Sequence, residues 1–320
     1  MKQAANRIFC VILSIFLFAC PALAAELIPV GEVIGLELRG DTVTVAAFDD
    51  LATAARDAGL QIGDRLLSID GRDIENAEDV RRALTESDGS VDVDILRDGK
   101  QKRIHLEPDI TTNGPRLGVY LRQGITGIGT VTWYDPDTGT FGTLGHGVND
   151  SSGNLLAMTT GRAYPASVIS VQKGRSGQPG QLKGALSGDH LLGQLSGNTA
   201  RGVFGTAPDA WEGKAISTAS YGEITTGPAT IRSTIDQGAP REYSVEILKI
   251  YPRSRADGRN FLLKVTDPDL LAATGGIVQG MSGSPIIQDG KLVGAVTHVL
   301  VNSPDTGYGI FIENMLDAAS

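Results

Sequence analysis

A glycine-rich loop near the C-terminal end carries the residues that point most directly to chemistry. It reads Gly280-Met281-Ser282-Gly283-Ser284-Pro285, and two apolar stretches around an Asp289-Gly290 turn follow it, which is the pattern of a β-hairpin. A serine hydroxyl attacks well only when a base takes its proton and backbone N–H groups receive the oxyanion. Glycines beside Ser282 let the loop turn its amides toward one point. The loop predicts a serine nucleophile; the alternative is a β-turn with incidental serines.

His146 is predicted to be the general base. It stands between two glycines, which leave room for a substrate, and an imidazole of ordinary pKa accepts a proton near neutral pH. The alternative is a histidine that merely fills a turn. His190 has the surroundings of a loop residue, and His298 lies 16 residues after Ser282, so it is expected to line a wall of the cleft. His105 alternates with apolar residues and is expected on a solvated strand face.

A serine and a histidine need a third group that orients the imidazole, and a carboxylate usually fills this role. The candidates are Asp150, Asp189, Asp267 and Asp269. Spacing alone does not choose among them.

The first 24 residues have the features of an export signal. A basic start is followed by an apolar run, Ile8 to Ala19, and by an Ala-x-Ala end that predicts cleavage after Ala24. The run is short for a membrane span, which needs about 20 apolar residues. Residues 8–25 together are long enough to remain as an uncleaved anchor, and Leu17-Phe18-Ala19-Cys20 distantly resembles a lipoprotein box.

Composition excludes several classes of function. Both cysteines, Cys10 and Cys20, lie in the export segment, so the mature chain has no disulfide, thiolate metal site or cysteine nucleophile. The net charge of −9 becomes −11 when Lys2 and Arg7 are removed, which disfavours nucleic-acid binding. The remaining chain, about 295 residues, suffices for two domains, and its 41 glycines favour turn-rich β structure.

The first domain is predicted over residues 25–108. Asn76 is a candidate cap for a helix over 77–85, and an Asp98-Gly99 turn joins two strands over 91–106. The motifs Ala58-Gly59-Leu60, Gly63-Asp64 and Ile69-Asp70-Gly71 resemble a PDZ domain of the bacterial protease-associated kind.

The PDZ resemblance implies a groove in which a peptide adds as an extra strand. The amides around Ile34-Gly35-Leu36 would hold its terminal carboxylate, and the ligand is expected to be a partner peptide or the chain's own N-terminal segment. The alternative is a PDZ fold that serves only as a spacer.

The second domain is predicted over residues 109–320. Its Gly-x-Ser-Gly-x-Pro loop resembles the nucleophile loop of chymotrypsin-like peptidases, which assigns attack to Ser282 rather than Ser284. The same resemblance implies an oxyanion hole made by the amides of Gly280 and Ser282. A nucleophile elbow of the α/β-hydrolase kind fits worse, because a predicted strand follows the serine where that motif needs a helix.

The wider chain resembles the stage IV sporulation protein B peptidases. The matching motifs are Leu-Gly-His-Gly at His146, Thr-Asp-Pro at Asp267, and the run from Gly276 through Pro285. The resemblance implies that His146, Asp267 and Ser282 are catalytic. It also implies cleavage of a membrane-bound regulatory protein between mother cell and forespore. Asp267 precedes Ser282 by 15 residues, unlike the aspartate of ordinary chymotrypsin-like enzymes, which lies far upstream.

These observations together predict a mainly β protein, with an N-terminal PDZ domain followed by a chymotrypsin-like double β-barrel. The expected function is that of an exported, membrane-associated serine endopeptidase that needs no metal and no cofactor. The rival is a non-catalytic PDZ and barrel module that binds a membrane partner. Self-cleavage near Ala24 to Val30 is a further hypothesis.

Overall fold

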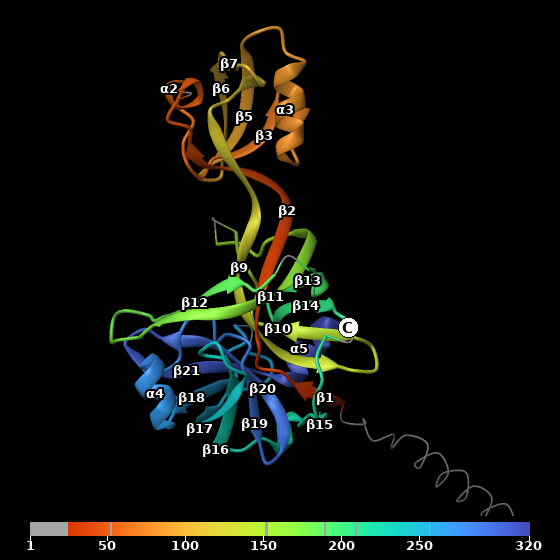
Figure 1. Ribbon diagram of the computed structural model, residues 1–320, viewed down its shortest axis with the longest axis vertical. Helices are drawn as coiled ribbons and strands as arrows, with labels where there is room; N and C mark the ends of the chain where they lie inside the picture. Colours follow the sequence, from red (N-terminus) through yellow and green to blue (C-terminus); the bar gives the residue numbers. More distant parts are fainter. Residues whose placement is uncertain (1–24, 52, 151–152, 189, 209, 256) are drawn as a thin grey trace, which may run out of the picture.

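The computed structural model describes residues 25–51, 53–150, 153–188, 190–208, 210–255 and 257–320. The predicted export segment and the candidate Asp189 therefore lie outside the described residues. Figure 1 shows a small domain, residues 41–124, above a larger body of strands. Two long strands, β2 (Val33–Phe48) and β9 (Val119–Asp135), run from the larger body into the small domain. Within the described part of the chain, no helix has the length and apolarity to span a membrane.

The small domain is a twisted sheet, in the order β9–β2–β3–β5–β6, with two helices. Its buried core joins residues from the sheet and from helix α3. The elements between β2 and β9 are α2 (Ala54–Asp57), β3 (Arg65–Ile69), β4 (Arg72–Asp73), α3 (Ala77–Thr85), β5 (Val91–Arg97), β6 (Lys100–Leu106), β7 (Asp109–Thr111) and β8 (Gly114–Arg116).

Two local predictions for this domain are confirmed. The Asn76 side chain accepts hydrogen bonds from the backbone amides of Glu78 and Asp79 and so caps α3. Asp98 and Gly99 have φ angles of 51° and 72°, and together they form the tight turn between β5 and β6.

The predicted boundary of the first domain is wrong at its N-terminal side, because residues 26–40 belong to the larger body. Leu36 pairs with Gly127 of β9 on one side and with Ala163 of β11 (Met158–Gln172) on the other. The predicted peptide-binding stretch Ile34-Gly35-Leu36 is therefore wrong as well. Both of its edges are already hydrogen-bonded within a sheet, so no edge remains for an added strand.

Six strands of the larger body close into a ring, the first barrel. Each strand pairs with the next in the order β2–β9–β10–β14–β13–β11, and β11 pairs with β2 again. Phe141 and Trp211 pack edge to face in its core, 5.3 Å between ring centroids. Besides β2, β9 and β11, the strands of this part are β1 (Glu26–Pro29), β10 (Thr140–Thr143), β12 (Gln181–Leu186), β13 (Gly193–Thr199), β14 (Gly202–Thr206) and β15 (Ile216–Ser217).

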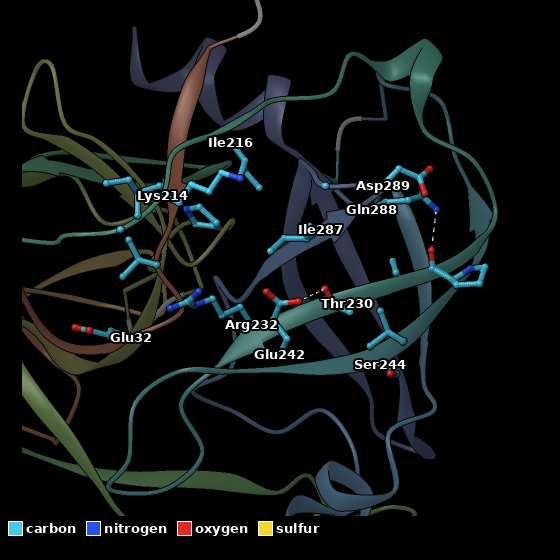
Figure 2. A pocket seen from close by; sticks show the side chains of 18 of the residues that line it. Glu32, Lys214, Ile216, Thr230, Arg232, Glu242, Ser244, Ile287, Gln288 and Asp289 are labelled. Carbon is cyan, nitrogen blue, oxygen red and sulfur yellow. Dashed lines mark hydrogen bonds between the residues drawn. The ribbon is translucent and has the colours of Figure 1, made fainter.

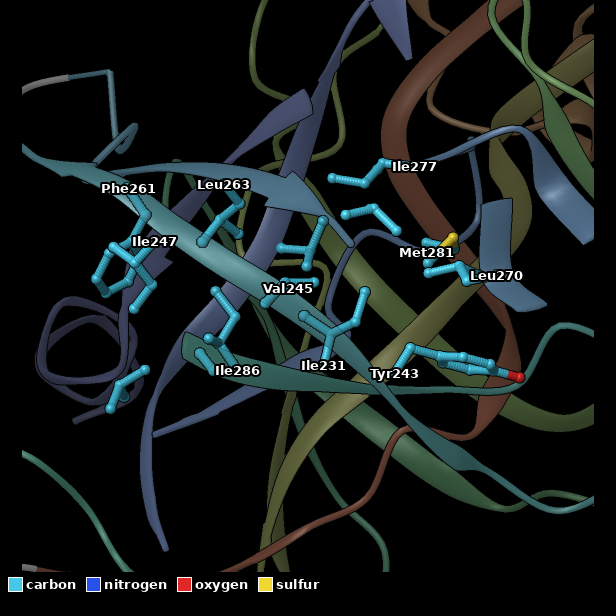
Figure 3. Packing of buried hydrophobic residues seen from close by; sticks show 14 of the residues in the cluster. Ile231, Tyr243, Val245, Ile247, Phe261, Leu263, Leu270, Ile277, Met281 and Ile286 are labelled. Carbon is cyan, nitrogen blue, oxygen red and sulfur yellow. The ribbon is translucent and has the colours of Figure 1, made fainter. Parts of the chain in front are cut away.

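The C-terminal third forms a second closed barrel, in the order β16–β17–β18–β21–β20–β19. Figure 3 shows its core, in which Ile231, Ile247 and Leu263 are fully buried. The mainly β class and the predicted double barrel are confirmed. Its elements are η1 (Tyr221–Glu223), β16 (Gly227–Ser233), β17 (Arg241–Ile250), β18 (Phe261–Val265), α4 (Pro268–Thr274), β19 (Pro285–Gln288), β20 (Lys291–Leu300), β21 (Ser303–Phe311) and α5 (Ile312–Ala319).

Candidate active site

The glycine-rich loop immediately precedes β19 and lies at the seam between the two barrels. Gly280 and Gly283 both have φ near +98°, a region that other residues avoid. A Cβ atom on Gly283 would lie 1.9 Å from the carbonyl oxygen of Thr130 in β9. The close turn around Ser282 therefore needs both glycines.

The loop presents only one of its two serines to a cavity. Ser282 is partly exposed and lines a cavity of about 480 Å³. Ser284 is completely buried, and its hydroxyl donates a hydrogen bond to the Ser233 hydroxyl, at 3.0 Å. The geometry thus favours Ser282 over Ser284 as a nucleophile.

His146 lines the same cavity from the first barrel, directly after β10. Leu144 and Gly145 before it have φ angles of 68° and 69°, and this turn sets the direction of the chain at His146. The Nδ1 atom of His146 lies 2.9 Å from the carbonyl oxygen of Gly147. Because a carbonyl can only accept, Nδ1 carries the proton, and Nε2 of the neutral ring is free to act as a base.

Burial holds His146 in its neutral form. It lowers the pKa of His146 below the ordinary value of 6.5, and the hydrogen bond to the Gly147 carbonyl opposes this effect in part. A neutral imidazole at working pH is what a general base requires.

The Ser282 hydroxyl donates a hydrogen bond to the carbonyl oxygen of Thr297, at 2.8 Å. No hydrogen bond joins Ser282 to His146 among the described residues. The Ser282 hydroxyl would have to leave the Thr297 carbonyl before it could donate to His146. Catalytic hydrogen bonds of this kind often tighten only when substrate is bound.

The predicted oxyanion donors are available. Neither the Gly280 amide nor the Ser282 amide has a hydrogen-bond partner within the described residues. The neighbouring amides each donate to a backbone carbonyl. The donating neighbours are Gln279, Met281, Gly283 and Ser284. Two free N–H groups in an otherwise satisfied loop are the pattern expected where an oxyanion is received.

His298 lines this cavity next to His146, as expected from the sequence. The ring centroids are 5.3 Å apart, and Nδ1 of His298 is buried without a hydrogen-bond partner among the residues that the structure describes. Burial, together with the charges of His146 and Arg259, lowers the pKa of His298 to about 4, although Asp257 opposes the shift. His298 is therefore also neutral near pH 7.

Asp267 does not take the place of a triad carboxylate in this structure. It is the N-cap of α4, and one carboxylate oxygen accepts hydrogen bonds from the amides of Asp269 and Leu270, each at 3.0 Å. The other accepts from the amide of Ser244, at 3.2 Å. Each hydrogen bond described for this carboxylate goes to a backbone amide, and none reaches His146.

The surroundings of Asp267 lead to a different cavity. Its neighbours Ser244 and Thr266 line a cavity of about 940 Å³, shown in Figure 2, which also contains Glu242 and Arg232. Neither Ser282 nor His146 is among the residues that line it. The triad assignment of Asp267 therefore has no geometric support.

Of the other carboxylate candidates, the structure describes Asp269 and Asp150, and it places neither of them in the cavity of Ser282 and His146. Asp269 lies in the first turn of α4, next to Asp267. Asp150 accepts a hydrogen bond from the Asn154 amide, at 3.0 Å, and lines a cavity without Ser282 or His146.

Two threonines of β9, which the sequence analysis did not single out, hold the nucleophile loop. The Thr130 hydroxyl donates to the Gly280 carbonyl at 2.8 Å, and the Thr132 hydroxyl donates to the Gly283 carbonyl at 2.7 Å. Their only signal in the sequence is the alternation Thr-Val-Thr, which puts both on one face of a strand.

Comparison with known families agrees with this architecture. The model of the family SpoIVB peptidase S55 matches residues 113–316, and a PDZ domain model matches residues 51–97. The second match lies within the small domain, so the predicted PDZ domain is confirmed.

Among curated proteins, the chain is similar to putative zinc metalloprotease R01501 of Rhizobium meliloti (strain 1021). The two are 29% identical over 220 residues, which are 65% of this chain and 52% of the relative. Putative zinc metalloprotease Atu1380 of Agrobacterium fabrum is 37% identical over 79 residues, 24% of this chain and 21% of that protein. This chain thus spans about half, or less, of the length of these relatives.

The zinc chemistry in those names has no counterpart in the part of the chain that the structure describes. That part holds no group of three or more His, Cys, Asp or Glu residues able to bind a metal ion. None of the four histidines stands in a His-Glu-x-x-His arrangement.

Two solved structures are distantly similar. The active form of the Rv3671c protease from M. tuberculosis is 13% identical and covers 62% of this chain and 73% of its own, with a TM-score of 0.38. The PDZ domain of the SdrC-like protein from Listeria monocytogenes is 20% identical and covers 25% and 87%, with a TM-score of 0.23. Because the S55 model matches more than half of the chain and spans most of both barrels, this protein belongs to the SpoIVB peptidase S55 family.

Proposed function

We propose that the protein is a serine endopeptidase in which Ser282 is the nucleophile and His146 the general base. One observation carries the proposal: both side chains line one cavity, beside the amides of Gly280 and Ser282, which have no hydrogen-bond partner in the described part of the chain. Family membership supports a peptide bond as the bond that is cleaved.

In the first step, the Ser282 Oγ attacks the substrate carbonyl carbon, and its proton passes to Nε2 of His146. The carbonyl oxygen becomes an oxyanion, which the amides of Gly280 and Ser282 receive. Collapse of this intermediate breaks the C–N bond, and His146 returns the proton to the leaving amine. Water then attacks the acyl group by the same route and restores the Ser282 hydroxyl.

The Gly147 carbonyl, in place of a carboxylate, fixes the tautomer of His146. It accepts from Nδ1–H at 2.9 Å and so leaves Nε2 unprotonated. A carbonyl stabilises the imidazolium less than a full negative charge does, so this arrangement supports a base that is well oriented but weakly assisted. The proposed catalytic groups are thus Ser282, His146 and the Gly147 carbonyl.

The substrate is proposed to place an apolar side chain in the cavity. The walls around Ser282 include Ile128, Ile277, Val278 and Val299. Apolar walls favour apolar groups of matching size, and no Asp, Glu, Lys or Arg is among the described residues that line the cavity to pair with a substrate charge.

We further propose export and membrane association, on the basis of the predicted signal or anchor in residues 1–24. The family resemblance supports a membrane-associated regulatory protein as substrate, in signalling between the compartments of a sporulating cell. N-terminal sequencing of the protein recovered from membrane and soluble fractions tests the location. Recovery only from the cytoplasm, with an intact N-terminus, would contradict it.

A serine-directed fluorophosphonate tests the enzyme proposal against the rival of a non-catalytic binding module. Labelling of the wild type is expected, and it should disappear in Ser282→Ala but persist in Ser284→Ala, because Ser284 is buried away from the cavity. Unfolding measurements on all three proteins serve as the control for folding. Folded wild type that resists labelling and cleaves no peptide would favour the binding module.

The PDZ domain is proposed to bind a peptide at a different place from the one predicted. Residues Val119 to Gln123 of β9 pair with β2 on one edge only. The start of helix α3 lies near this segment: Gln123 donates to the Glu75 carbonyl just before α3, at 2.7 Å, and β8, which precedes β9, contacts α3. An extended peptide can add to such an edge as a strand.

Binding of fluorescent peptides tests this second proposal. A library with free C-terminal carboxylates, screened against Ser282→Ala to prevent cleavage, should yield ligands whose amidated forms bind more weakly. Replacement of Leu121 by proline, on the proposed edge strand, is expected to abolish binding, since proline removes a backbone N–H donor and disturbs the strand. Unchanged binding by a folded Leu121→Pro variant would place the ligand elsewhere.

A further inference from the structure

We propose that Thr130 is a positioning residue that sets the geometry of the oxyanion-binding loop; this inference rests on the proposed peptidase function. Thr130 lies in β9, is completely buried, and touches no solvent. It comes from the first barrel, whereas the loop that it holds belongs to the second.

Thr130 holds the loop at both residues that carry the proposed oxyanion donors. Its amide donates to the Ser282 carbonyl at 3.0 Å, and its hydroxyl donates to the Gly280 carbonyl at 2.8 Å. Because peptide units are planar, these bonds fix the Gly280–Met281 and Ser282–Gly283 units, which flank the unit that carries the Ser282 amide.

The same residue also holds the histidine segment. The carbonyl of Thr130 accepts from the Leu144 amide, at 3.3 Å, and from the Thr143 hydroxyl, at 2.6 Å. These two residues lie just before His146. A single residue therefore links the segment of the base to the loop of the nucleophile, across the seam between the barrels.

The hydroxyl is the part of Thr130 that substitution can remove cleanly. The backbone contacts of Thr130, such as the packing of Gly283 against the Thr130 carbonyl, do not depend on the Thr130 side chain. Loss of the hydroxyl leaves the Gly280 carbonyl without this donor, and the Gly280–Met281 peptide unit, which lies between the two oxyanion amides, gains freedom. Preorganised donors are worth most when they do not have to reorient during the reaction.

The test compares Thr130→Ser with Thr130→Ala. Both variants lose the threonine methyl group, but only serine keeps a hydroxyl that can reach the Gly280 carbonyl. The effect on kcat is expected to be about tenfold to a hundredfold for alanine, below the 10²- to 10³-fold effect of deleting an oxyanion donor. Serine should stay within about threefold of the wild type, and KM should change little in either variant.

A matched control separates positioning from general loss of stability. Thr234 is also a buried threonine, and its hydroxyl donates to the Gly31 carbonyl at 3.0 Å, outside the active-site cavity. Thr234→Ala is expected to lower the melting temperature about as much as Thr130→Ala does while leaving kcat unchanged. Equal losses of kcat in the two alanine variants would overturn the inference.

Failure of this inference and failure of the proposed function give different results. If Ser282→Ala remains active, the proposed function is wrong. If Ser282→Ala is inactive while a folded Thr130→Ala keeps full kcat, only the role of Thr130 is wrong. Should Thr130→Ala not fold, the serine variant still decides: a kcat much below the wild type in folded Thr130→Ser contradicts a role for the hydroxyl.

Discussion

The imidazole rings of His146 and His298 lie side by side across the active-site cavity, with centroids 5.3 Å apart and planes tilted by 43°. His146 follows β10 of the first barrel, whereas His298 belongs to β20 of the second. Two protonated imidazoles at this distance would repel each other. The pair therefore favours two neutral rings, the state in which His146 can act as a base.

Protonation of His298 is expected to weaken the fold in acid. Its pKa is lowered to about 4 from an ordinary value of 6.5, so the folded state binds fewer protons than the unfolded state between these values. Stability from this residue is therefore fully present above pH 6.5 and is lost as the pH falls toward 4. The melting temperature should fall through this window less steeply in His298→Phe than in the wild type.

The exposed His190 provides the control for this titration. Melting curves of His190→Gln at the same series of pH values should run parallel to those of the wild type. If His298→Phe is also parallel, the stability of the protein does not depend on that ring.

The pH profile of kcat/KM should report the buried base. Burial lowers the pKa of His146 below 6.5, so activity is expected to persist below pH 6.5 and to decline only in more acidic solution. The profile is measured with a peptide substrate that carries no titrating group in this range. A midpoint above 6.5 would mean that the base lies in a more negative environment than the one around His146.

Substitution of Asp267 should affect stability rather than catalysis. Asparagine caps helices about as well as aspartate, so Asp267→Asn is expected to keep both fold and kcat. Asp267→Ala should lose about 1 kcal/mol of unfolding free energy through the lost cap, with kcat retained in the folded fraction. Loss of about 10⁴-fold in kcat by a folded Asp267→Asn, as in a triad aspartate, would restore the carboxylate role.

Gly283 should tolerate no side chain. A Cβ atom there would lie 1.9 Å from the Thr130 carbonyl oxygen and 2.6 Å from the Leu144 nitrogen, so Gly283→Ala must displace the loop or the histidine segment. Gly290 is the matched control, because it also has a positive φ, +74°, but a Cβ would meet nothing within 4 Å.

Fluorophosphonate labelling and thermal melts compare the two glycine variants. Gly290→Ala is expected to lose about 1–2 kcal/mol through backbone strain while its labelling rate stays normal. Gly283→Ala should lose labelling even at temperatures where it remains folded. Normal labelling of Gly283→Ala would show that the loop can relax without harm.

The sequence was most informative where the controlling interactions are local. Asn76 caps a helix three residues away, and Asp98-Gly99 closes a hairpin between adjacent strands, so both could be predicted from short patterns. Ser282 and His146 could be singled out for a related reason. Each stands in a glycine-rich loop whose composition reflects its own backbone conformation.

The errors arose where distant pairing decides. Ile34-Gly35-Leu36 has the pattern of an apolar strand, but its partners lie about 90 and 130 residues away in sequence, and no local pattern specifies that register. Asp267 is a different case, because an aspartate followed by proline is a local helix-cap signature, and that signature accounts for its position in the structure. Thr130 resembles any strand threonine until its partners are known.

The PDZ domain is an insertion between two neighbouring strands of a peptidase barrel, since Leu38 pairs with Ile125 where the chain leaves and re-enters the larger body. A fragment that starts at residue 109 would lack strand β2 of that barrel. Strands β9 and β11, which pair with β2, would then each have an unpaired edge prone to aggregation. Excision of the insert with a short bridging turn leaves the ring of strands complete. Work on the isolated catalytic unit therefore calls for an internal deletion and not for truncation from the front.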